Sequence, residues 1–271
     1  TGAPVTSFTF QVQDDGGVAN GGVDLDPAPK TMWINVAPVN DPPAGTDGTV
    51  TTPEDTPYVI AAAAFGFTDP LDNPANGLRA VEITMLPAAG SLTNGGVAVT
   101  AGQFIPAADL AAGKLQFTPA ANAPATPYTT FTFQVQDDGG IANGGVDLDP
   151  TPNTLTINVT PVNDAPSFLK GADQTVFEDA GPQTVAGWAT AIFAGPPDEA
   201  GQTLDFIVSN DNNALFATPP AVATDGTLTY TPAANANGAA TVTVTLTDDA
   251  TAGGTALTTS APPFTITVTS V

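Results

Sequence analysis

The stretch TFTFQVQDDGGIANGGVDLDPTPNTLTINVTPVNDAPSF, residues 130–168, decides the fold of this chain. It contains an alternating strand, an acidic glycine-rich turn, a second alternating strand and an Asn-Asp-Ala-Pro junction. Almost the same passage occurs once before, since residues 7–42 match residues 130–165 at 28 of 36 positions. A copy this close indicates an array of repeated units joined end to end.

The duplicated junctions divide the chain into three parts. Residues 1–41 are the C-terminal part of a truncated repeat, residues 42–164 form a complete repeat, and residues 165–271 form a complete but diverged repeat. The diverged repeat carries LTYTPAAN where the middle repeat carries LQFTPAAN. Because two strands cannot form an independent sandwich, we expect the natural chain to continue N-terminally. We also expect that its end at Val271 is a cut at the edge of a unit within a longer array.

Short alternating strands, punctuated by 27 Gly and 27 Pro, predict an all-β fold. The expected architecture is a linear array of tandem Greek-key β-sandwiches, each contacting only its neighbours. Phe8, Phe10 and Val12 share one parity, which predicts a half-buried strand in the first part. Residues 107–113 predict a single helical turn closed by Gly. Both Trp33 and Trp188 lie in apolar patterns, so we expect them to be packing residues.

The charge balance narrows the classes of function that the chain can have. The chain has 27 acidic and four basic residues and a formal net charge of −23. Nucleic-acid binding needs clustered Lys and Arg, so this class is disfavoured, whereas bound cations suit the composition. No apolar run approaches the ~20 residues of a transmembrane segment. The absence of Cys and His excludes disulfides, thiolate sites, Ser-His triads and His-ligated zinc.

Many acidic residues lie at strand ends, which gather at the two poles of a sandwich. Carboxylates forced together at a junction repel one another unless a cation lies between them. Calcium accepts six to eight oxygen ligands in irregular geometry, so it suits such loops. Paired carboxylates also serve as acid and base in glycosidases. Here the pairs recur in every unit, which favours a structural role, and we predict that the chain is not an enzyme.

The order of the motifs resembles the cadherin-type repeat, in the bacterial form found in large surface adhesins and secreted repeat proteins. The middle repeat has Pro53-Glu54, then Asp69 with Asp72, then Asp137-Asp138-Gly139, and finally Asn163-Asp164-Ala165-Pro166. The chain departs from that family in lacking an Asp-Arg-Glu motif, and its linker lacks the upstream Asp and the trailing Asn.

This resemblance implies calcium sites at both junctions. The first would use Asn40, Asp41, Asp69, Asp72, Asp137 and Asp138. The second would use Glu54, Asp55, Asn163, Asp164, Asp198, Glu199, Asp248 and Asp249.

Simpler interpretations exist for the same residues. Asp137-Asp138 also fits an Asp-Gly hairpin turn, and Asn163-Asp164 also fits a turn before Pro. For these residues the order of the motifs favours calcium ligation. The alternating pairs Asp24/Asp26 and Asp147/Asp149 are better explained as a solvated strand face or edge protection. A second calcium site in that Gly-rich hairpin is the minor alternative.

The resulting functional hypothesis is a calcium-stiffened extender segment of a large bacterial adhesin or surface repeat protein. It would lie outside the cell or on its surface, space a distal binding domain from the cell, and contribute to adhesion or biofilm formation. Its partners would be the neighbouring repeats, and an unknown receptor would bind another domain. The alternative is a calcium-dependent carbohydrate- or ligand-binding module.

Overall fold

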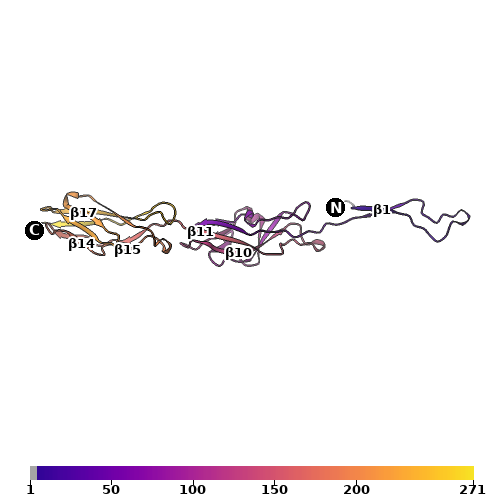
Figure 1. Cartoon of the computed structure of the whole chain (residues 1–271), viewed down its shortest axis with the longest axis horizontal. Coiled ribbons are helices and arrows are strands. Elements are labelled where there is room, and N and C mark those ends of the chain that lie inside the picture. The colour runs from indigo at the N-terminus through magenta and orange to yellow at the C-terminus, as the bar shows by residue number, and fades with distance from the viewer. Residues whose placement is uncertain (1–4) are drawn as a thin grey trace.

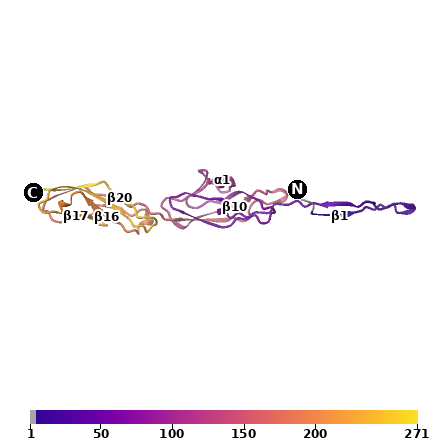
Figure 2. The same ribbon diagram turned by 90° about the horizontal axis from the view of Figure 1, so that it is seen from above.

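A computed structural model describes residues 5–271. The chain forms a β-hairpin and two β-sandwiches that follow one another in a line, with the hairpin at one end and the C-terminus at the other (Figure 1, Figure 2). The predicted all-β sandwich fold is confirmed. Among the described residues, no helix is long and apolar enough to cross a membrane.

The middle repeat packs a five-stranded sheet against a four-stranded sheet. The larger sheet has the order β3-β11-β10-β5-β8, with β3 Gly48–Pro53, β11 Asn153–Thr160, β10 Ala125–Asp137, β5 Leu78–Met85 and β8 Gln103–Pro106. The smaller has the order β4-β9-β6-β7, with β4 Tyr58–Val59, β9 Leu115–Thr118, β6 Ser91–Asn94 and β7 Val97–Ala98. The predicted helical turn is α1, Ala107–Ala111, and Gly113 follows it with φ +67°.

The third repeat is built in the same way. One sheet has the order β13-β21-β19-β16, with β13 Gln174–Phe177, β21 Phe264–Thr269, β19 Gly238–Thr247 and β16 Asp205–Asn210, and β20 Thr258–Ser260 also pairs with β19. The other has the order β14-β18-β17, with β14 Gln183–Val185, β18 Leu228–Pro232 and β17 Phe216–Val222. A two-stranded sheet joins β12 Ser167–Leu169 to β15 Thr190–Phe193.

Short 3₁₀ turns connect these strands: η1 Ala19–Gly21, η2 Ala62–Phe65, η3 Ala142–Gly144, η4 Pro197–Glu199 and η5 Asn213–Leu215. Each sandwich has its own hydrophobic core, because alternate residues of its strands point into the space between its two sheets. In β10, Phe131, Phe133 and Val135 are fully buried. In the third repeat, the ring of Trp188 lies 4.4 Å from that of Phe264, centroid to centroid, so Trp188 is a packing residue as predicted.

The first part of the chain departs from expectation. It forms only a hairpin, with β1 Thr6–Phe10 paired antiparallel to β2 Lys30–Ile34, and every residue of both strands is exposed. The prediction of a half-buried strand is therefore wrong, because no second sheet in residues 5–271 covers this pair. The packing role predicted for Trp33 is also wrong, since 61% of this residue is exposed.

Strand direction places the acidic residues at the poles. In the middle repeat, β10 runs antiparallel to β11, and β3 runs parallel to β11. The end of β10 at Asp137 and the start of β5 at Leu78 therefore meet at the pole that faces the hairpin. The end of β3, which precedes Glu54, lies at the opposite pole, beside the linker that follows β11.

Candidate metal centres at the repeat junctions

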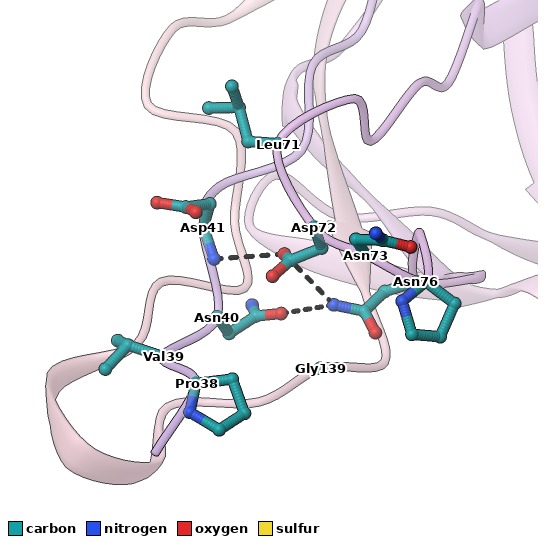
Figure 3. A pocket seen from close by; sticks show the side chains of 10 residues that line it. Pro38, Val39, Asn40, Asp41, Leu71, Asp72, Asn73, Asn76 and Gly139 are labelled. Atoms are coloured by element: carbon teal, nitrogen blue, oxygen red, sulfur yellow. Dashed lines mark hydrogen bonds between the residues drawn. The ribbon is translucent and has the colours of Figure 1, made fainter. Parts of the chain in front are cut away.

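The first junction joins the Pro38–Pro43 linker to two loops of the middle repeat (Figure 3). The Asn40 side chain reaches the end of β10, because its Nδ2 donates to Asp137 Oδ1 at 3.1 Å and to the Val146 carbonyl at 2.7 Å. The backbone N–H of Asp41 donates to Asp72 Oδ2 at 3.0 Å. The linker is therefore tied to two of the acidic residues named from the sequence.

Asn76, for which no role was predicted from the sequence, lies at the centre of this junction (Figure 3). Its Nδ2 donates to Asp72 Oδ2 at 3.2 Å and to Asn40 Oδ1, and its backbone N–H donates to Asp69 Oδ2. Its position four residues after Asp72, just before a Gly, is the only signal in the sequence. Asn76 connects the acidic turn to the linker.

The second junction repeats this arrangement around Asn163 and Asp164. Asn163 Nδ2 donates to Asp248 Oδ1 at 3.1 Å, and the Asp164 N–H donates to Glu199 Oε1 at 2.8 Å. Gln202, also missed from the sequence, takes the place of Asn76 and donates to Asn163 Oδ1. Two junctions of different sequence thus share one pattern of contacts, in which the linker Asn and Asp each meet an acid of the following repeat.

The second junction also receives acidic residues from the preceding repeat. The Glu54 Oε1 atom accepts the Val162 N–H at 2.7 Å, which places this side chain at the linker. Burial raises the pKa of Glu54, and the nearby charges of Asp198, Asp55 and Asp164 raise it further. Residues of the middle repeat, linker and third repeat therefore contribute to one concentration of negative charge.

The same causes act on the neighbouring acids. Burial raises the pKa of Glu199, with contributions from the charges of Asp164, Asp198 and Asp248. It also raises the pKa of Asp164, which is close to the charges of Asp55 and Asp198. At the first junction, burial raises the pKa of Asp137. The anionic forms of these groups are therefore disfavoured unless a positive charge compensates them.

Several junction acids have a buried carboxylate oxygen without any hydrogen-bond partner. These oxygens are Glu54 Oε2, Glu199 Oε2, Asp248 Oδ2 and Asp69 Oδ1, and each residue is at most 6% exposed. A buried charge normally requires a partner, and leaving one unpaired costs free energy. Among residues 5–271 the three salt bridges, of Lys30, Arg79 and Lys114, involve none of these four acids. Carboxylate oxygens of this kind are the ligand type that a hard cation accepts.

The side chain of Asn122 also lies at the second junction, beside Asp55 and Asp164. Its side-chain oxygen faces the carboxylates of Asp55 and Asp164. With the amide turned, its nitrogen would donate to Asp55 Oδ2 at 3.1 Å and to Asp164 Oδ2 at 3.2 Å. The turned amide satisfies both carboxylate contacts. In residues 5–271 as they stand, no three acidic side chains are grouped closely enough to hold an ion.

Asp138 and Asp249 have a different environment from the other predicted ligands. Asp138 Oδ1 accepts the Gly77 N–H at 2.7 Å, and Asp249 Oδ2 accepts the Thr203 N–H at 2.8 Å. Hydrogen bonds from Thr251 and Thr203 lower the pKa of Asp249 to about 2. In the described structure both residues hold the loop that precedes the first long strand of their repeat.

For Asp149, the prediction that the alternating pair Asp147/Asp149 lies on a solvated strand face is wrong. Asp149 is buried, not part of a solvated face, and its oxygens accept the N–H groups of Gly45 and Thr151 and the Asn153 amide. Its hydrogen bonds fasten the segment after the first linker to the start of β11. Because its carboxylate is fully hydrogen-bonded, this contact network explains Asp149 without a metal.

The raised pKa values predict an unusual pH dependence of thermal stability when the buffer contains a chelator. An acid whose pKa is higher in the folded state contributes stability below its unfolded pKa, and this contribution is lost as the pH rises through the folded value. Lowering the pH from neutral toward the ordinary carboxyl pKa of about 4 should therefore raise the melting temperature through Glu54, Asp164 and Glu199. Thermal melts in chelator check this. A midpoint that falls steadily over that range would contradict it.

Residues 163–260, which cover the second linker and most of the third repeat, match the family described as Bacterial Ig domain. No curated protein matches the chain. Among solved structures, human mucin-like protocadherin EC1-2 has 12% identity and a TM-score of 0.41, with 84% of this chain and 98% of that chain covered. Human protocadherin-24 EC1-2 (form II) has 16% identity and a TM-score of 0.46, with the same coverage. The human desmocollin-1 ectodomain has 13% identity and a TM-score of 0.39, with 98% of this chain and 47% of that chain covered.

Proposed function

We propose that this chain is a calcium-stiffened extender segment of a large bacterial extracellular adhesin or surface repeat protein. The observation that carries the proposal is the set of buried, unpartnered carboxylate oxygens at the junctions, above all those of Glu54, Glu199 and Asp248. The bacterial Ig domain match of the third repeat supports an extracellular, adhesion-type module. A spacer role agrees with sandwiches arranged in a line (Figure 1).

The ion class follows from the ligands. Carboxylate and amide oxygens without Cys or His suit calcium better than zinc. The second junction would hold calcium through Glu54, Asp55, Asn163, Asp164, Asp198, Glu199 and Asp248. The first would use Asn40, Asp41, Asp69, Asp72 and Asp137. Asp138 and Asp249 would act beside them by holding the loops.

Calcium would act on the joint and not on a substrate. In its absence, the acids of two repeats repel one another across the linker, and the sandwiches can turn away from each other. A bound ion would be attracted to carboxylates on both sides and oppose that separation. The paired acids recur at each junction, which supports a structural role in place of catalysis.

Small-angle X-ray scattering tests the proposal on the whole chain. We expect the maximum dimension to increase when calcium replaces chelator, with a midpoint at about 10⁻⁴–10⁻³ M, as in extracellular calcium modules. Magnesium at the same concentration is the matched control, since it requires a stricter octahedron. An unchanged maximum dimension between chelator and millimolar calcium would overturn the proposal.

A further inference from the structure

Strand β16, Asp205–Asn210, forms an open edge of the third repeat. Within residues 5–271 it pairs with β19 on one side and with no strand on the other. Its outward-facing Ile207 is 56% exposed, whereas the neighbouring Phe206 is buried in the core. An edge strand presents unpaired backbone N–H and C=O groups, so β16 is a template on which another strand can pair.

The middle repeat shows what an edge at this position accepts. Its strand β5 corresponds to β16, because each pairs antiparallel with the long strand that leads to the Asp of a junction, Asp137 or Asp248. By register, Ile207 takes the position of Glu82. On the outer side of β5, strand β8 pairs antiparallel and places Phe104 opposite Glu82. In residues 5–271 no strand occupies the corresponding place beside β16.

The other sheet edges of the two sandwiches carry protection that β16 lacks. Strands β3, β8 and β17 contain Pro. Strands β4, β7, β13 and β14 have four residues or fewer. Proline and short length are two ways in which sheet edges avoid pairing with another chain. Strand β16 has six residues, DFIVSN, without Pro, Lys or Arg, so its best-matched partner among these edges is the same strand of a second molecule.

We propose that β16 is a docking edge through which two copies of this chain associate side by side, by antiparallel pairing of β16 with β16. The two sheets that contain β16 become one continuous sheet, and the two chains run in opposite directions. The contact lies on the side of the third repeat, and its formation does not require calcium at the junctions. Because a single pair of short strands buries little surface, the association is weak and reversible.

The pleat of the strand fixes the register of this pairing. Directly opposite residues of an antiparallel pair lie on the same face of the sheet, so the outward-facing Ile207 lies opposite another outward-facing residue. With the two-fold axis at this position, the two copies of Ile207 face each other. Asp205 then faces Ser209, and Phe206 faces Val208. This register covers the exposed Ile207 and gives each Asp205 carboxylate a hydroxyl neighbour.

The placement of charge is compatible with this register. Strand β16 contains one charged residue, Asp205, and its two copies lie at opposite ends of the paired strands. Four residue steps of about 3.4 Å separate them, roughly 14 Å in all, which exceeds the Debye length of about 8 Å at physiological ionic strength. Asp211, which follows the strand, accepts the Thr241 N–H at 2.7 Å and is held against its own β19. The net charge of −23 keeps the association weak without placing like charges opposite each other.

Single cysteines test the register, since the chain has no Cys of its own. Ile207→Cys places two thiols opposite each other, with Cβ atoms about 4.5–5.5 Å apart, close to the separation in a disulfide. We expect mild oxidation to link this variant into dimers at least about tenfold faster than Asp205→Cys or Ser209→Cys alone. An equimolar mixture of Asp205→Cys and Ser209→Cys should link rapidly, because these positions face each other. Equal rates for the three single variants, or faster linkage of Ser209→Cys alone, would overturn the proposal.

Sedimentation velocity of the cysteine-free chain gives a second measurement. Chelator keeps the result separate from calcium binding at the junctions. From about 10 μM to about 1 mM, in about 0.15 M salt, the wild-type chain should pass from monomer toward dimer. Ile207→Asp places two carboxylates opposite each other, so it should weaken this association at least about tenfold.

Phe177→Asp is the matched control, because Phe177 is 62% exposed and lies in β13, at the opposite edge of the same sheet. It should leave the association unchanged, and thermal melts confirm that both variants are folded. A wild-type chain that stays monomeric up to about 1 mM would overturn the proposal. Association that Ile207→Asp leaves unchanged would also overturn it, since another surface would then be responsible.

Discussion

Phe133→Ala should lower the free energy of unfolding of the middle repeat by about 3–5 kcal/mol, the usual cost of truncating a buried Phe. The Phe133 ring is fully buried, and its centroid lies 4.8 Å from that of Phe65 in an edge-on arrangement. Removing it leaves a cavity between two strands and the 3₁₀ turn that covers them. Chemical denaturation of the wild-type chain and the variant, with hydrogen exchange in the middle repeat as the readout, measures this loss.

Phe10→Ala is the matched control for that substitution. Phe10 lies in the same sequence, FTFQVQDDGG, but 37% of it is exposed, and within residues 5–271 β1 pairs with no strand other than β2. We expect its truncation to change stability by less than about 0.5 kcal/mol, as is usual for surface positions. Equal losses at both positions would show that Phe10 is buried in solution, and would contradict the exposed hairpin.

Glu54→Gln should weaken calcium binding at the second junction by about tenfold, or ~1.4 kcal/mol. The substitution keeps the size of the side chain and the oxygen that accepts the Val162 N–H, but removes the negative charge. Because calcium affinity depends on the number of charged ligands, the loss should fall on this junction alone. Calorimetric titration of the wild-type chain and the variant checks it.

Glu178→Gln provides the control. Glu178 Oε1 accepts the Val271 N–H at 3.2 Å, as Glu54 accepts that of Val162, but it lies at the far pole of the third repeat. Its substitution should leave calcium binding unchanged. If the two variants bind calcium equally well, Glu54 is not a ligand, and the assignment of the second junction fails.

Much of the fold could be predicted from the sequence. Alternation of Phe131, Phe133 and Val135 identified a core strand, because a period of two places such residues on one face of a sheet. The duplicated Asn-Asp-Pro and Asn-Asp-Ala-Pro segments predict where one repeat ends and the next begins. The same alternation misled for Phe8 and Phe10, since a pattern states which face is apolar and not whether another sheet is present to cover it.

The contacts at the candidate site could be predicted only in part. Acidic residues at strand ends were recognised, since strand direction assigns each end to a pole. Asn76, Gln202 and Asn122 were missed because an amide carries no charge, and its role depends on loop conformation. Asp149 was misplaced for a related reason: backbone N–H groups of a distant segment, including that of Gly45, satisfy a carboxylate that appears solvated in the sequence.

The central claim is that calcium fixes the middle and third repeats relative to each other. The chain has no Cys, so Thr51→Cys with Thr241→Cys allows spin labels at one exposed site in each repeat. Pulsed electron paramagnetic resonance then measures the distribution of distances across the second junction. We predict a narrow distribution in millimolar calcium and a broad one in chelator. Distributions of equal width in both conditions would contradict the account.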